Sequence, residues 1–121
     1  MKTILFITTI LVFVASLAFS QVETITTAQA KDFINKEVIL TGKVVATRVV
    51  NDRNGKQIMF INLDEKYPNN PVDVVIFNEV FEKMKLVEGE ILNKTVKIKG
   101  FLSTYKEKPQ MIIQSEESLS Y

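Results

Sequence analysis

Apolar and polar residues alternate along most of the chain after residue 36, which is the pattern of strands with one buried face. Five such runs are rich in β-branched and aromatic residues, and they cover residues 37–50, 57–64, 72–78, 93–105 and 109–115. In the first run, one face consists of Val38, Leu40, Gly42, Val44 and Ala46. The pattern therefore predicts five strands around an apolar core.

Turn and helix signals separate these runs. Asn54-Gly55 tolerates positive φ at both centres of a tight hairpin, and residues 106–108 form a second short turn. Residues 26–36 contain helix formers with Thr26 or Thr27 as the cap, and their inward side would carry Ala30, Phe33 and Ile34. A further helix is expected to begin at the cap Asn78 and to end before Gly89, with its inward side made of Val80, Phe81 and Met84.

The order of these elements predicts an all-β fold, a small β-barrel. Five strands with a helix between the third and fourth are typical of the five-stranded OB-fold, here preceded by a short N-terminal helix. Gly42 and Gly100 lie inside long strands, where closing a small barrel requires a sharp bend. We expect the OB-fold domain to span residues 26–115, after a flexible segment 21–25 and before a frayed C-terminus, 116–121.

The first twenty residues have the pattern of a secretory signal peptide. A short basic start precedes the apolar run of residues 4–17, and Ala18-Phe19-Ser20 places small residues where a signal peptidase cuts. Cleavage after Ala18 or after Ser20 fits equally well. An uncleaved anchor is the alternative, although the run is shorter than the roughly 20 residues that span a bilayer. We expect an exported monomer, periplasmic or extracellular, that meets the membrane only transiently through this leader.

Composition narrows the chemistry of the domain. Without Lys2, the chain carries equal numbers of basic and acidic side chains, so no net charge attracts polyanions. The chain has neither histidine nor cysteine, which excludes Ser-His and Cys-His catalysis and the usual zinc sites. Asp64, Glu65 and Asp73 could bind a hard cation, or act with arginines in a nuclease, but nothing in their spacing favours this. We expect no enzyme activity, no cofactor and no metal.

Aromatic and basic residues are the candidate binding groups. On the fourth strand, Lys97, Lys99, Phe101 and Tyr105 would point away from the core. OB-folds bind ligands across their second and third strands and on the loops beside them. The loop between the first and second strands carries Arg48, Arg53 and Lys56, and the loop between the fourth and fifth carries Lys106 and Lys108. Tyr67, which precedes Pro68 in another loop, could stack on a base. Phe60 and Phe77 lie in apolar runs and are expected in the core.

Three stretches carry a resemblance to a known family. They are "VILTGKVV", "MFINLDEKYPNNPVDVVIF" and "NKTVKIKGFLSTYKEKPQMII", and they resemble the small secreted bacterial OB-fold domains of the tRNA-anticodon-binding-like type. The resemblance implies single-stranded DNA or RNA as the ligand. Under this hypothesis the domain is a non-catalytic binding module, with phosphate contacts from the lysines and arginines named above and stacking on Tyr67, Phe101 and Tyr105.

Two alternatives remain open from the sequence. The same barrel could hold another envelope protein or an oligosaccharide, since OB-folds also bind sugars. The lysines of the fourth strand could also act only to keep the domain soluble and to prevent edge pairing. Binding of phosphate weakens steeply with salt, whereas an apolar protein contact does not, so salt dependence separates the ligand classes.

Overall fold

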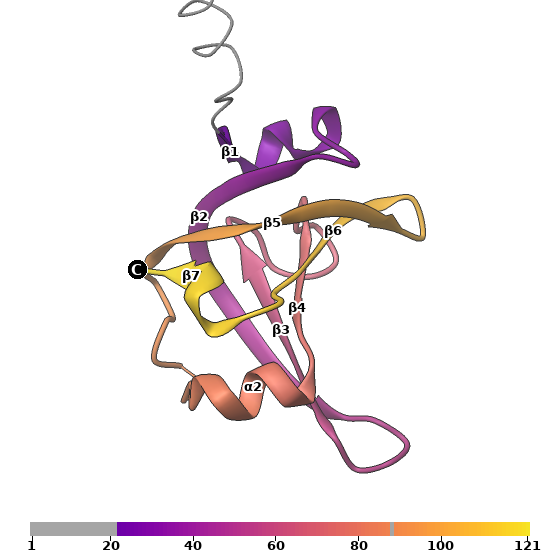
Figure 1. Cartoon of the computed structure of the whole chain (residues 1–121), viewed down its shortest axis with the longest axis vertical. Helices are drawn as coiled ribbons and strands as arrows, with labels where there is room; N and C mark the ends of the chain where they lie inside the picture. The colour runs from indigo at the N-terminus through magenta and orange to yellow at the C-terminus, as the bar shows by residue number, and fades with distance from the viewer. Residues whose placement is uncertain (1–21, 88) are drawn as a thin grey trace, which may run out of the picture.

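The computed structural model describes residues 22–87 and 89–121, so the predicted leader lies outside the described part of the chain. Its elements in order are β1 (Thr24–Thr26), η1 (Thr27–Asp32), β2 (Glu37–Asn51), β3 (Gln57–Leu63), β4 (Asp73–Ile76), α2 (Asn78–Met84), β5 (Thr95–Tyr105), β6 (Lys108–Ile112), η2 (Glu116–Ser118) and β7 (Leu119–Ser120) (Figure 1). Within these two described ranges, no helix has the length and apolar character needed to cross a membrane.

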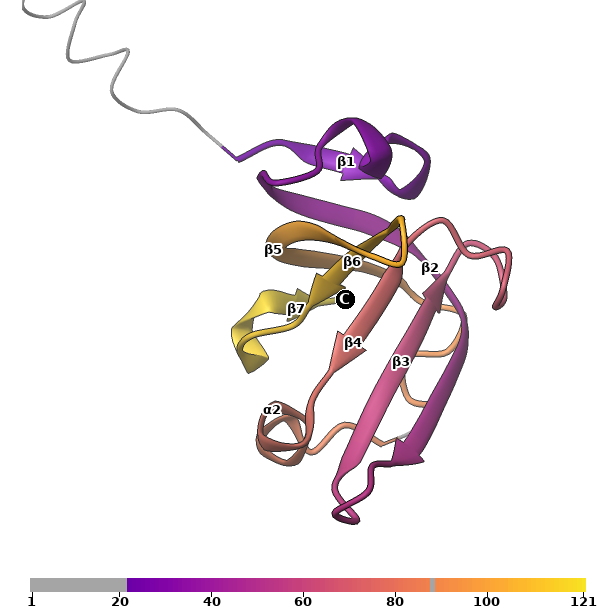
Figure 2. The same ribbon diagram turned by 90° about the vertical axis from the view of Figure 1, so that its right-hand side faces the viewer.

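Strands β2 to β6 close into a barrel. β2 pairs antiparallel with β3, and β3 pairs antiparallel with β4. β4 runs parallel to β6, β6 pairs antiparallel with β5, and β5 returns to pair with β2. This is the strand order of the OB-fold, so the predicted fold class is confirmed. The helix η1 and the helix α2 lie at opposite ends of the barrel (Figures 1 and 2).

The two in-strand glycines lie where their strands change partner. β2 pairs with β5 up to Lys43 and with β3 from Val44 onward, with a register shift just after it. A Cβ on Gly42 would lie 3.1 Å from the Cβ of Leu63. β5 changes from β2 to β6 directly after Phe101, and a Cβ on Gly100 would lie 3.2 Å from Met111 Sδ. The predicted bends at both glycines are therefore confirmed.

The core consists of the alternate inward residues of these strands. On β2, Val38, Leu40 and Val44 are at most 1% exposed, as the sequence pattern predicts. Ala46 is instead partly exposed, because the register shift between Val44 and Ala46 interrupts the alternation. Ile98 on β5 and Met111 on β6 meet this cluster from the far side of the barrel.

Both ends of the described domain pair with strands of the barrel. Thr24 and Ile25 belong to β1, which pairs in parallel with β2 and buries Ile25. The C-terminal segment adds β7 beside β5 and buries Leu119, and the Tyr121 hydroxyl donates to Glu90. This hydrogen bond to a carboxylate raises the pKa of the Tyr121 phenol. Both terminal segments thus supply partners to strand edges that would otherwise be bare.

The helices and the first hairpin differ in detail from the prediction. Residues 26–36 form only the six-residue 3-10 helix η1, in which Gln29 Oε1 accepts the N–H of Thr26. Helix α2 ends at Met84 because Lys85 adopts positive φ. In the β2–β3 hairpin, Gly55 has positive φ but Asn54 does not. Asp52 Oδ1 accepts two backbone N–H groups there, so the turn is wider than a two-residue turn.

Candidate functional site

The outer face of β3, β4 and β6 carries a regular array of side chains. Since Met59, Ile61 and Leu63 are buried in the core, the residues between them point outward. The strand register places Phe60 beside Val75, and Val75 beside Ile112. One row further along, the neighbours are Asn62, Asp73 and Gln110. This face therefore combines an apolar row with a polar row.

A groove of about 620 Å³ lies at the end of this face beside the β5–β6 hairpin. Arg48 of β2 and Phe60 of β3 line one side of it. The β3–β4 loop contributes Tyr67 to the lining, and β4 contributes Asp73. The β5–β6 hairpin contributes Tyr105, Lys106 and Lys108. Five of the ten binding residues predicted from the sequence are thus brought together here: Arg48, Tyr67, Tyr105, Lys106 and Lys108.

The Arg48 guanidinium lies close to two aromatic rings in the groove. Its guanidinium carbon lies 5.2 Å from the centre of the Phe60 ring and 5.8 Å from that of Tyr67. These distances allow cation–π attraction. Within residues 22–87 and 89–121, no carboxylate lies within 4 Å of the Arg48 guanidinium. The positive charge of Arg48 is therefore held in place by rings and is not neutralised by an acid.

Lys106 and Lys108 of the β5–β6 hairpin differ in their partners. Lys106 Nζ lies 5.4 Å from the Tyr105 ring centre, and no acid of the described chain pairs with it. Lys108 Nζ lies 3.2 Å from Asp73 Oδ1 and donates to Asn70 Oδ1 at 2.8 Å. The buried Asn70 in turn donates to the same Asp73 oxygen. The structure thus ties Lys108 into an internal network, although the sequence marks it as a phosphate contact.

Three predicted binding residues lie on a different surface, which we name the lysine face. Lys97, Lys99 and Phe101 point outward from the half of β5 that pairs with β2, and all three are exposed. Lys99 Nζ lies 3.7 Å from the Glu37 carboxylate across the strand pair. The bend at Gly100 separates this surface from Tyr105, which lines the groove. The single row of Lys97, Lys99, Phe101 and Tyr105 expected from the sequence is therefore divided between two surfaces.

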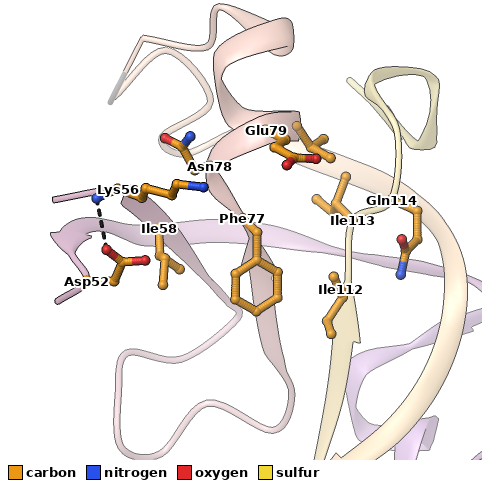
Figure 3. Close-up of a pocket in the computed structure, with 10 residues that line it drawn as sticks. Asp52, Lys56, Ile58, Phe77, Asn78, Glu79, Ile112, Ile113 and Gln114 are labelled. Atoms are coloured by element: carbon orange, nitrogen blue, oxygen red, sulfur yellow. Dashed lines mark hydrogen bonds between the residues drawn. The ribbon is translucent and has the colours of Figure 1, made fainter. Parts of the chain in front are cut away.

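Arg53 and Lys56 lie on the β2–β3 hairpin, at the end of the barrel near α2 (Figures 1 and 2). Lys56 borders a second hollow of about 290 Å³, which we name the side pocket (Figure 3). Its apolar lining consists of Ile58, Phe77, Val80, Ile112 and Ile113, and its polar lining includes Asp52, Lys56, Asn78 and Glu79. The side pocket and the groove share the outer face of the same strands.

Phe60 and Phe77 do not lie where the sequence pattern predicts. Both were expected in the core, but Phe60 is partly exposed in the groove and Phe77 is 46% exposed at the side pocket. The alternation of β3 contains the missing signal, because Met59 and Ile61 cannot both face inward unless Phe60 faces outward. A ring on the outer face of a barrel strand is a candidate contact for a ligand.

Asp64 has a structural role in the fold. Its Oδ2 accepts the Thr27 hydroxyl at 2.5 Å, and its Oδ1 accepts the backbone N–H of Lys43 at 3.0 Å. These bonds fasten η1 and β2 to the end of β3. In the described ranges, no group of three or more acidic residues is close enough to hold a metal ion.

Comparison with solved structures finds chains of low sequence identity. A chain provisionally named aspartyl-tRNA synthetase from Leishmania major is 11% identical, with a TM-score of 0.48 over 80% of this chain and 20% of the other. A provisionally named nucleic acid-binding lipoprotein from Klebsiella pneumoniae is 13% identical, with a TM-score of 0.46 over 71% and 73%. The second OB-fold domain of replication protein A from Methanococcus maripaludis is 10% identical, with a TM-score of 0.40 over 72% and 84%. This chain spans only a fifth of the length of the first of these proteins.

Family assignment comes from the sequence match. No curated protein matches the chain significantly. The family model described as "OB-fold nucleic acid binding domain", of the tRNA anti-codon type, matches residues 38–119. The matched range includes β3 to β6 and every groove residue named above. Because this match covers well over half of the sequence, the chain belongs to the OB-fold nucleic acid binding domain family.

Proposed function

We propose that this domain binds single-stranded nucleic acid in the groove. The observation that carries the proposal is that Phe60, Tyr67 and Tyr105 converge in one concave site with two cations, Arg48 and Lys106. No acid among residues 22–87 and 89–121 forms an ion pair with either cation. Family membership supports the same ligand class. Single strands are held in this way, by aromatic rings that stack on bases and by positive charges along the backbone.

The exposed rings are suited to stacking. Tyr67 is 66% exposed and Tyr105 is 55% exposed, so each can offer a ring to an unpaired base. Arg48 lies beside Phe60 and Tyr67, and a guanidinium plane can stack on a base as well as contact a phosphate. The bases of a duplex are already paired and stacked, so the groove favours a single strand.

The number of cations available to phosphate in the groove predicts the salt dependence. For single strands the slope of log affinity against log salt is about −0.7 for each phosphate neutralised. Two contacts, from Arg48 and Lys106, predict a slope of about −1.4, so the affinity falls about sevenfold between about 50 and 200 mM salt. If all seven cations named in the sequence analysis bound phosphate, the loss over that range would be about a thousandfold.

The test is a titration of fluorescein-labelled oligo-dT and oligo-rU, each of about 10 nucleotides, followed by fluorescence anisotropy at both salt concentrations. Lys106→Ala is expected to flatten the slope by about 0.7, whereas the matched control Lys97→Ala on the lysine face leaves it unchanged. If neither oligonucleotide binds at the lower salt, nucleic-acid binding is rejected and a protein or oligosaccharide ligand is favoured. An equal effect of both lysines would contradict the placement in the groove.

We also propose that the domain is exported and acts without catalysis. The apolar leader followed by Ala18-Phe19-Ser20 supports export, and the lack of histidine and cysteine supports a binding role. Intact mass and N-terminal sequencing of protein recovered from the periplasm of a bacterial host expressing the full chain test the export. The mature chain is expected to begin at Phe19 or Gln21. Recovery of the full chain from Met1 in the cytoplasm alone would reject export.

A further inference from the structure

The side pocket lies at the start of α2 (Figure 3), and strands β3 and β6 contribute to the lining of both the side pocket and the groove. The two hollows are joined by the row of Phe60, Val75 and Ile112. Phe60 lines the groove, Ile112 lines the side pocket, and Val75 between them is only 2% exposed. Phe77 follows Val75 by two residues, about 7 Å along the strand. Ile58 of β3 lines the side pocket and Phe60 lines the groove, and they lie about 7 Å apart along the strand. A strand bound in the groove can therefore place a neighbouring base at the side pocket.

The polar groups at the side pocket can form hydrogen bonds to a ligand. Within the described residues, Glu79 forms no side-chain hydrogen bond or ion pair. Asp52 Oδ1 accepts the backbone N–H groups of Asn54 and Lys56, which leaves Oδ2 for a ligand. The Lys56 ammonium has no acid within 4 Å among the same residues. In Figure 3, Lys56 and Glu79 lie on opposite sides of Phe77.

The charges of the side pocket differ from those of the groove. Two carboxylates and one ammonium border the side pocket. Their net charge is negative, which disfavours the binding of a phosphate. A carboxylate is an acceptor only, and it is best matched by two donors that point the same way. Among the four bases, guanine presents two such donors on its Watson–Crick edge, N1–H and the N2 amino group, with the acceptor O6 beside them. Thymine and uracil present one N–H between two carbonyl oxygens, which a carboxylate repels.

We infer that the side pocket selects a guanine base in the strand bound by the groove, and this inference rests on the proposed function. The Glu79 carboxylate accepts N1–H and the N2 amino group, and the Lys56 ammonium donates to O6. Phe77, with nearly half of its surface exposed, provides the stacking ring. The phosphates of the same strand remain with Arg48 and Lys106 in the groove.

The test uses labelled oligo-dT of about 10 nucleotides and a set of the same oligonucleotides with one dG placed at successive positions. At the best position, one dG is expected to raise the affinity about tenfold over oligo-dT, as for a good bidentate contact. Deoxyinosine at that position lacks the N2 amino group and is expected to lose most of this gain. Glu79→Gln is expected to abolish the preference for dG without weakening the binding of oligo-dT, because the amide no longer repels the thymine carbonyl oxygens.

Glu82→Gln is the matched control, because it removes the same charge from α2 but does not line the side pocket. It should keep the full preference for dG. A preference that survives Glu79→Gln, or a dG that changes affinity at no position although oligo-dT binds, would overturn the inference and leave the groove in place. If no oligonucleotide binds at all, the proposed function itself fails.

Discussion

The groove and the lysine face carry the same kinds of side chain in different surroundings. In the groove, the β3–β4 loop and the β5–β6 hairpin bring Tyr67 and Tyr105 towards the rings and charges of the strands. On the lysine face, Lys97, Lys99 and Phe101 project from the paired strands β2 and β5, and Phe101 is 53% exposed. A base above such a ring contacts it on one side, whereas a base in the groove can be enclosed by several side chains.

The two surfaces also differ in how their cations are held. The Arg48 guanidinium lies beside two rings, which fix its position without cancelling its charge. Lys99 lies near Glu37, and both side chains are more than half exposed, so the pair contributes little to stability but lowers the local positive charge. Residue type alone therefore does not define a binding site. The shape of the surface and the partners of each charge decide it.

Removing one ring from each surface gives the largest expected difference. Phe60→Ala removes a stacking surface and the ring that supports Arg48, and we expect it to weaken oligo-dT binding by about 5- to 150-fold, the range for loss of one base–aromatic stack. Phe101→Ala on the lysine face is expected to change the dissociation constant less than about twofold, because a ring outside the groove provides no such stack. Fluorescence anisotropy measures both.

Thermal unfolding of the two variants is the control for this pair. Both rings lie outside the core cluster, so each variant should retain a cooperative transition. Phe60→Leu should unfold like the wild type but still bind weakly, since it keeps an apolar side chain and loses only the ring. Equal losses of affinity in Phe60→Ala and Phe101→Ala would show that the ligand crosses both surfaces.

The fold was predictable because its determinants are local. Alternation along β2 and β5 predicted the buried residues, and Gly42 and Gly100 marked the bends that give each strand two partners. The exposed position of Phe60 was harder to predict. Apolar residues occupy both faces of β3, and the sequence does not say which face is covered by other elements. Only the closed barrel shows that Met59 is inside and that Phe60 faces the groove.

The candidate site was only partly predictable, because it depends on contacts between distant residues. Lys108 meets Asp73 and Asn70 because β4 and β6 run side by side in parallel, a pairing that the linear sequence does not display. The same holds for Arg48, whose contact with Tyr67 depends on where the β3–β4 loop folds over. Basic residues could be found from the sequence, but their availability for phosphate could not.

A smaller effect on affinity is expected when Lys108 loses its ion pair with Asp73. Asp73→Asn keeps the size of the side chain and an oxygen that can accept the Asn70 amide, but it removes the negative charge 3.2 Å from the Lys108 ammonium. Lys108 would then become a third cation available to phosphate in the groove. We expect oligo-dT to bind about threefold more tightly at low salt, with a salt slope steeper by about 0.7. Because this ion pair is only about a quarter exposed, we expect a loss of stability of about 1 kcal/mol, the upper end of the range for exposed pairs.

Anisotropy titrations at two salt concentrations measure this change, and Glu65→Gln is the matched control. It removes the same charge from the exposed β3–β4 loop at a residue that does not line the groove. An equal gain in both variants would mean that net charge alone raises the affinity. A loss of binding by a stably folded Asp73→Asn variant would mean that the Asp73 carboxylate itself contacts the strand. If only Asp73→Asn gains affinity, the ion pair with Asp73 is what keeps Lys108 from contacting phosphate. The position of Lys108 in the groove is the same in both proteins, and only its neutralising charge differs.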